Sequence, residues 1–269
     1  MYTQSDNLTD ANSAPSRKET LHQKIAQLFC TPLFLGLIAC YSATQVISLF
    51  TLSDRNPMAY LLSILKSWGI NDYLITGPLS QLSNTIQSVQ LFLLVPCIVV
   101  AIALWIIALN AKKYGEKRLY NIGFTTIQVI KFNQMIIMGI ALVLVAIKGY
   151  SLLNELKELL ILVSLQDAEK WIGIAKVMLV VGAIGTIYFT FRVLLTFSLM
   201  KESACETVSI QQTSLFVPIV CFILSAVSLL IQIKFGFDLV SLLNCGSAIL
   251  FGVYLLNYRK VMDQLEQLG

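Results

Sequence analysis

The chain has 269 residues, of which 57% are hydrophobic and only 13% are charged, and its mean hydropathy is +0.76. Soluble domains carry about a quarter charged residues, so this composition excludes a disordered protein, a collagen-like fibre and an ordinary soluble enzyme. Lysine and arginine exceed aspartate and glutamate by only 19 to 15, too small a surplus for a nucleic-acid-binding surface, and we therefore predict an all-α, polytopic integral membrane protein.

Residues 1–27 are mostly polar, and we predict that they form a disordered cytoplasmic tail. The charge-free run that follows, from Ile25 to Ser53, is too long for the apolar region of a secretory signal. It also lacks the small-residue pattern of a cleavage site. We therefore predict that it stays in place and forms the first transmembrane helix, residues 28–50.

Five further stretches are apolar and long enough to cross a bilayer core of about 30 Å. A charged side chain at the centre of a membrane helix costs at least about 2.5 kcal/mol, so each predicted helix is limited by nearby charges. Lys148, Lys176 and Arg192 lie near predicted helix ends and can extend toward the headgroups. The predicted transmembrane domain, 28–258, thus contains helices at 28–50, 89–110, 132–153, 171–199, 213–233 and 237–258, and a short cytoplasmic tail, 259–269, follows it.

Two of the connections have the pattern of an amphipathic helix on the outer membrane surface. In the first, Asn56-Pro57 is typical of a helix start, and apolar residues recur at helical spacing up to Gly69. In the second, a similar apolar stripe runs from Leu152 to Val163. The shared plan could indicate a weak repeat of hairpins, although interfacial helices are also common between unrelated spans. The third outer connection is predicted to be only a tight turn at Gly236 and Asp238.

The basic residues predict the orientation of the chain. With both termini inside, 12 of the 19 lysines and arginines lie on the cytoplasmic side and 7 lie outside. The largest group, Lys112 to Arg118 together with Lys131, occupies the connection between the second and third helices. Cytoplasmic loops carry an excess of positive charge, so we predict an N-in, C-in topology. The same cluster could also contact anionic lipid.

The sequence shows no pattern of a catalytic, cofactor-binding or metal site. The six predicted helix cores contain no acidic residue, which argues against carboxylate-based ion coupling. The six cysteines form no CxxC pair, and one histidine, His22, does not make a zinc site. Nucleotide-binding, metalloprotease and serine-hydrolase motifs are also absent. We therefore predict no catalytic residue, no cofactor and no metal ligand.

Uncharged polar residues at membrane depth are the remaining candidates for contacts. Gln45 in the first helix and Asn244 in the sixth are the two we single out, with helix packing as the main interpretation and a substrate contact as the alternative. Pro32, Pro96 and Pro218 fall early in their predicted helices, where proline is tolerated. A broken helix that binds substrate is the alternative for the prolines.

Two stretches resemble a known group of proteins. The run Cys30-Thr31-Pro32-Leu33-Phe34-Leu35, followed by Tyr41-Ser42, is similar to the first span of uncharacterised multi-span membrane proteins of Gram-positive anaerobic bacteria, and Gly123–Gln134 is similar too. No activity is assigned to that group. The resemblance therefore implies a bacterial cell membrane and the same general layout.

These observations lead to a multi-pass protein of the cell membrane whose functional class stays open. We expect a non-enzymatic membrane component that acts through helix packing or partner contacts, with the lipid bilayer and a protein partner or second copy as its partners, and no nucleic acid. The alternative is a transporter or permease subunit for an unidentified solute, which six spans and the prolines favour. An intramembrane enzyme ranks last, because no nucleophile has an identifiable base.

Overall fold

The structure, a computed structural model, describes residues 24–51, 72–113, 121–162, 168–206 and 212–267, and every regular element in these ranges is helical. A five-residue π-helical turn, η1 (Glu202–Glu206), directly follows α6. The long helices, in chain order, are α2 (Pro32–Thr51), α4 (Asp72–Lys113), α5 (Ile122–Leu162), α6 (Ala168–Lys201), α7 (Phe216–Phe235) and α8 (Leu239–Gln267).

All six helices are long enough and apolar enough to cross a membrane, which confirms the predicted set of six apolar helices. Two of them are much longer than predicted, because α4 and α5 have 42 and 41 residues, whereas α6, with 34, is only slightly longer than its predicted range 171–199. A bilayer core needs only about 20. The second predicted surface helix, 152–163, is not a separate element, because residues 152–162 continue α5 without a break. The first, around 57–69, lies outside the described residues.

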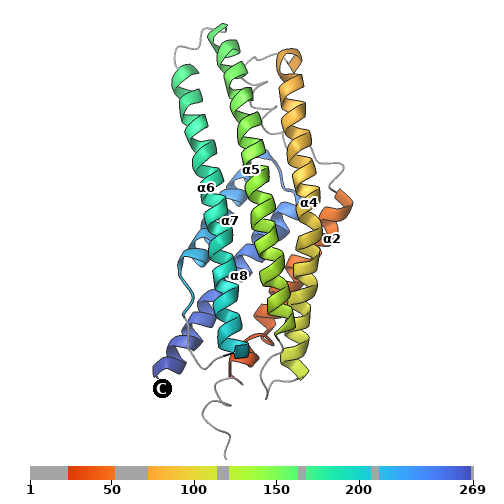
Figure 1. The fold of residues 1–269 in the computed structure, drawn as a ribbon, viewed down its shortest axis with the longest axis vertical. Helices are drawn as coiled ribbons and strands as arrows, with labels where there is room; N and C mark the ends of the chain where they lie inside the picture. The colour runs from red at the N-terminus through yellow and green to blue at the C-terminus, as the bar shows by residue number, and fades with distance from the viewer. Residues whose placement is uncertain (1–23, 52–71, 114–120, 163–167, 207–211, 268–269) are drawn as a thin grey trace, which may run out of the picture.

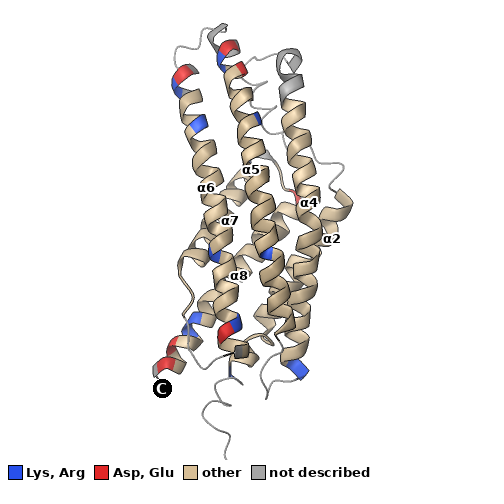
Figure 2. Ribbon diagram, viewed as in Figure 1, with Lys and Arg blue, Asp and Glu red and all other residues tan. Residues whose placement is uncertain are grey.

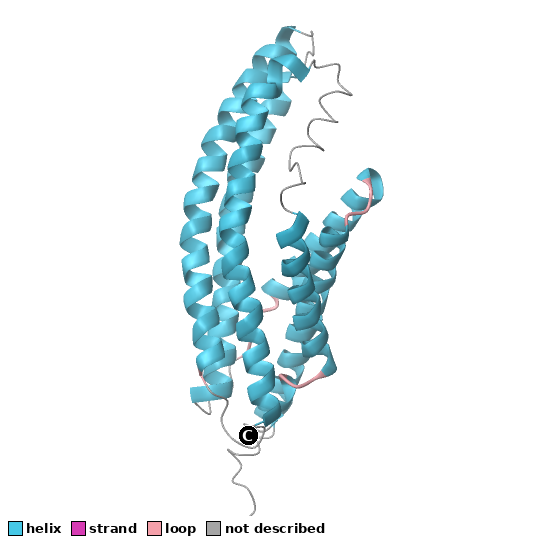
Figure 3. Cartoon of the chain, turned by 90° about the vertical axis from the view of Figure 1, so that its right-hand side faces the viewer, coloured by secondary structure: helices cyan, strands magenta, loops and turns pink. Residues whose placement is uncertain are grey.

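The six helices form two layers that meet at the end of the molecule where the chain ends. In one layer α4, α5 and α6 lie side by side, and in the other α8 lies between α2 and α7 (Figure 1). The layers lie close at this end and diverge toward the other (Figure 3). Contacts between α2 and α4 join them, including a hydrogen bond that the indole of Trp105 donates to Ser42 Oγ at 3.1 Å.

A cluster of aromatic rings connects the two layers near this end. Phe29 packs edge-on against Phe34 and Phe124, with ring centroids 5.3 and 5.4 Å apart, and Phe34 lies 4.9 Å from Tyr254. Each of these four side chains is at most 2% exposed. Phe124 belongs to α5, whereas Phe34 and Tyr254 belong to α2 and α8, so the cluster spans both layers.

The chain enters this cluster through residues that we had placed in the polar tail. Ile25 and Ala26 are each 1% exposed, so these last residues of the predicted tail 1–27 belong to the packed core, while residues 1–23 lie outside the described residues. Thr31 then starts α2, because its Oγ1 accepts the backbone N–H of Phe34 at 3.3 Å. Pro32 is the first residue of α2. Proline is tolerated there because the N–H that it lacks would have no acceptor inside the helix.

The predicted tight turn between α7 and α8 is confirmed. Gly236 has φ +106°, a conformation that favours glycine, and its N–H donates to the carbonyl of Gln232 at 2.8 Å. Asp238 Oδ2 then accepts the N–H and the hydroxyl of Ser241, at 3.0 and 2.7 Å. This side-chain cap starts α8, which continues to Gln267 and so includes most of the predicted tail 259–269.

Candidate functional site

A cavity of about 290 Å³ lies between the two layers, and all six long helices contribute to its wall. Most of the lining is apolar, with the aromatic side chains of Phe34, Phe189, Phe197 and Phe251 among it. The polar side chains in the wall are those of Tyr41, Lys131, Gln134, Thr190, Ser247 and Tyr254.

Lys131 is the one charged side chain among the described residues of this lining. It lies in α5, about 13 Å along the helix axis from Ile122, at about 1.5 Å per residue. The side chain is half-buried, and none of the described residues forms a hydrogen bond or an ion pair with it. A desolvated cation without a partner is costly, so its position in a cavity marks a candidate binding site.

This position corrects the sequence-based assignment of Lys131 to a connection. That assignment began the third span at residue 132, directly after this charge, but α5 begins at Ile122, and Phe124 and Ile127 are fully buried. A second basic residue, Arg192 of α6, lies equally far from the end of its helix at Lys201. Its guanidinium is 6.0 Å from the centroid of the Phe216 ring, and it is not part of the cavity lining. Figure 2 shows isolated blue turns in the largely uncharged helices α5 and α6.

Gln134 lies one turn beyond Lys131 on the same face of α5. It is 3% exposed, and its Nε2 donates to the sulfur of Cys97 at 3.2 Å and to the carbonyl of Leu93 at 3.5 Å. Both acceptors flank Pro96 of α4. Pro96 was predicted early in a span, but it lies deep inside α4, where a proline removes one hydrogen bond of the helix.

Two tyrosines of the opposite layer also line the cavity. The hydroxyl groups of Tyr41 and Tyr254 are buried, and neither has a hydrogen-bond partner among the described residues. Thr190 is less available, because its hydroxyl donates to the carbonyl of Thr186 at 2.9 Å. The hydroxyl of Ser247 donates to the carbonyl of Asn244 at 2.9 Å. The cavity wall thus combines one unpaired cation, one amide and two unpaired hydroxyls with a large apolar surface.

The two residues that we singled out from the sequence are not in this cavity. Gln45 is 8% exposed in α2 and Asn244 lies on an exposed face of α8, and neither belongs to the lining. Sequence reasoning missed Lys131 and Gln134. The sequence does contain a pattern that could have identified them. Lys131, Gln134 and Met138 occupy positions i, i+3 and i+7, which lie on one face of a helix.

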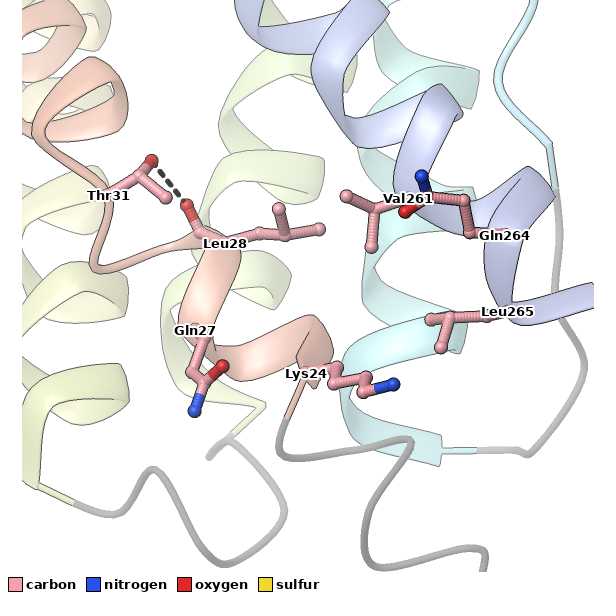
Figure 4. Close-up of a pocket in the computed structure, with 7 residues that line it drawn as sticks. All are labelled: Lys24, Gln27, Leu28, Thr31, Val261, Gln264 and Leu265. Carbon is pink, nitrogen blue, oxygen red and sulfur yellow. Dashed lines mark hydrogen bonds between the residues drawn. The ribbon is translucent and has the colours of Figure 1, made fainter. Parts of the chain in front are cut away.

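A second, larger hollow of about 710 Å³ lies at the end of the bundle, between residues 24–31 and the last turns of α8 (Figure 4). Its polar side chains are Lys24, Gln27, Thr31 and Gln264, and Thr31 is already bonded to the carbonyl of Leu28 at 2.8 Å. Its lysine, Lys24, is exposed at the end of the bundle, whereas Lys131 is half-buried in the wall of the first cavity. We therefore take the cavity around Lys131 as the candidate site.

The described residues contain no group of three or more histidines, cysteines, aspartates or glutamates that could hold a metal ion. The described cysteines are all free thiols. The lining of the cavity offers a ligand the ammonium group of Lys131, the amide of Gln134 and an apolar wall.

No protein-family model, no curated protein and no solved structure matches this chain. The resemblance to multi-span proteins of Gram-positive anaerobic bacteria consequently stays a prediction.

Proposed function

We propose that this chain is a multi-pass protein of the cell membrane that binds a small solute between its two helix layers, as a transporter or permease subunit. The observation that supports this most directly is the unpaired Lys131 in the wall of an interior cavity. Ionisable residues at membrane depth commonly mark a substrate pathway. Interior pockets that combine an apolar wall with a few polar groups are the usual form of a small-molecule site.

The surface of the molecule supports the membrane location. Large apolar side chains are exposed within several helices, including Phe92, Met178 and Leu230, which are 69%, 67% and 67% exposed. Exposing this apolar surface to water would cost about 25 cal/mol per Å² relative to an apolar environment. Charged residues gather at the two ends of the bundle (Figure 2). The described chain starts and ends at the same end of the bundle (Figure 4), which accords with both termini in the cytoplasm.

Uptake by reconstituted vesicles tests the proposal. The full chain would be inserted into phosphatidylcholine vesicles, and the flux of a panel of labelled small solutes, both polar and amphipathic, would be compared with that of empty vesicles. We expect at least one solute to cross faster with the protein, and binding of the same solute to raise the thermal midpoint of unfolding in a neutral detergent. If no solute changes either quantity, the proposal is wrong.

A component that acts through protein contacts is the second candidate, and α6 favours it. Within its most apolar stretch only 6% of the residues are buried, and few contacts join α6 to the second layer. Val177, Val181 and Ile184 are 62%, 59% and 63% exposed and could contact another membrane helix as readily as lipid. Cross-linking between cysteines introduced at Val181 would test for a second copy, and native mass spectrometry of the purified protein would reveal another partner.

A further inference from the structure

We infer that the cavity between the layers recognises a solute with one anionic group, a carboxylate or a phosphate ester, attached to an apolar body. This inference rests on the proposed solute-binding function and adds the chemical class of the solute. Its basis is the combination of Lys131, Gln134 and the aromatic wall in one cavity.

The charge of the cavity wall gives the sign of the solute. Among the described residues that line the cavity, Lys131 is the one cation, and none is an aspartate or glutamate. The thiol of Cys97 has an electrostatic effect on Lys131, but a thiol is a weak partner for an ammonium group. An anion would supply the countercharge that the described residues do not provide, and a charge-assisted hydrogen bond in a low-dielectric site is among the stronger polar interactions.

Gln134 offers a second donor beside the ammonium group. Its Nε2 donates to the sulfur of Cys97 at 3.2 Å and to the carbonyl oxygen of Leu93 at 3.5 Å. Neither is a strong hydrogen bond, so an anionic oxygen would be a better acceptor for this amide than either of them. A carboxylate or phosphate with two or more oxygens could therefore accept from Lys131 and from Gln134 at once.

The apolar part of the cavity wall indicates the size and polarity of the rest of the solute. Phe189, Phe197 and Phe251 line the cavity together with leucine, valine and methionine side chains. The volume of about 290 Å³ lies at the lower end of the range for drug-sized ligands. A compact apolar or aromatic body with one anionic end fits this space better than a sugar or a polyanion. Such an anion could be a soluble organic acid or the headgroup region of a small anionic lipid.

Three analogues of one shape separate recognition of charge from recognition of shape. We would measure binding of 4-phenylbutyrate, its neutral amide and 4-phenylbutylamine to the full chain in a neutral detergent, by titration calorimetry. We expect the acid to bind at least about tenfold more tightly than the amide, and the amine to bind most weakly. Inorganic phosphate, which lacks the apolar body, should bind more weakly than the acid.

Variants of Lys131 then test whether this residue causes the preference for the acid. Lys131→Gln should remove the preference for the acid, and Lys131→Arg should keep it, because the positive charge remains. Lys148→Gln is the matched control, since Lys148 lies on the same helix with an exposed side chain outside the cavity. It should leave all three affinities unchanged. The thermal midpoint of each variant shows whether the protein is folded, and the comparison of analogues on the unmodified chain does not depend on any variant.

Nanodiscs identify the source of the anion. If phosphatidylglycerol competes with 4-phenylbutyrate and is retained by the unmodified chain but not by Lys131→Gln, recognition of the anionic group is supported and a lipid supplies it. If phosphatidylglycerol does not compete, a soluble acid is supported. Equal binding of the acid, amide and amine would overturn the inference and leave the solute-binding cavity standing. Absence of any binding or flux would contradict the proposed function itself.

Discussion

Gln134 of α5 donates a hydrogen bond of 3.2 Å to the sulfur of Cys97, the residue that directly follows Pro96 in the interior of α4. An amide from one helix thus contacts the turn of a neighbouring helix in which a proline interrupts the backbone hydrogen bonds. Both Gln134 and the adjacent Lys131 line the cavity between the layers. The proline, the amide and the cation therefore belong to one local arrangement.

Replacing this proline should change stability and binding in opposite directions. In Pro96→Ala the new N–H can donate to the carbonyl of Phe92, so α4 gains a hydrogen bond and unfolding should cost about 1–3 kcal/mol more. The thermal midpoint should rise by about 2–4 °C for each kcal/mol. The straighter helix would shift Cys97 and Leu93 relative to Gln134, so the affinity for an anionic solute should fall.

Pro218→Ala is the control for this substitution. Pro218 is the third residue of α7, where a backbone N–H has no acceptor inside the helix, so its replacement restores no intrahelical bond. We expect a much smaller change of the thermal midpoint. An unchanged midpoint in Pro96→Ala would show that the proline does not weaken α4.

The close approach of α4 and α5 depends on Gly123. A Cβ atom at this position would lie 2.6 Å from Cγ1 of Ile107 and 3.0 Å from the carbonyl oxygen of Ala103. Gly123→Ala should therefore lower the free energy of unfolding by about 1–2 kcal/mol, because an overpacking cost of about 1–3 kcal/mol outweighs the better helix propensity of alanine. Thermal unfolding in neutral detergent measures this change.

We expect Gly139→Ala on the same helix to change the free energy of unfolding in the opposite direction. No atom lies within 4 Å of a Cβ built at Gly139. Only the gain in helix propensity remains, so the free energy of unfolding should rise by about 0.5–1 kcal/mol. A similar effect of both substitutions would contradict the tight contact between α4 and α5.

An exposed ion pair between the far ends of α5 and α6 should make stability depend weakly on pH. Lys157 donates a hydrogen bond to Glu169 Oε1 and lowers the pKa of this carboxyl group from its ordinary value. The folded state therefore favours the carboxylate. The pair contributes above the ordinary pKa of glutamate, and this contribution is lost as the pH falls through the lowered pKa.

The difference in thermal midpoint between the unmodified chain and Glu169→Gln measures this contribution. It should be small at pH 7, because the pair is exposed. It should vanish once the pH lies below the lowered pKa of Glu169, and it should also shrink in about 1 M salt. Lys157→Gln should behave like Glu169→Gln. A difference that grows on acidification would have the wrong sign for this pair.

The sequence predicts the helices of this fold well and its cavity poorly, for one physical reason. Long stretches without charge identify six apolar helices, because lipid tolerates few charged side chains. The same rule began the third predicted span directly after Lys131. A lysine that faces a cavity can lie within a membrane-spanning helix, and α5 in fact begins at Ile122. Gln45 and Gln134 are both single amides in apolar stretches of the sequence. Which of them lines the cavity depends on how the two layers of helices pack, and the sequence does not show this packing.

A lysine at Ile184 tests whether the exposed surface of α6 faces lipid. Ile184 lies close to the midpoint of α6 and is 63% exposed. On a protein surface in water, such a substitution changes stability by no more than about 0.5 kcal/mol. In the centre of a bilayer it costs about 2.5–3.5 kcal/mol. We therefore expect Ile184→Lys to reduce the amount of folded protein in the membrane fraction and to lower its thermal midpoint in nanodiscs.

Ile174→Lys provides the matched control on the same helix. Ile174 is 44% exposed and lies near the start of α6, where a lysine side chain can extend to the headgroups. Its replacement should be tolerated, with a midpoint close to that of the unmodified chain. If Ile184→Lys were equally well tolerated, the middle of α6 would be in contact with water or covered by polar groups of another protein, and the proposed placement of this helix in the bilayer would be wrong.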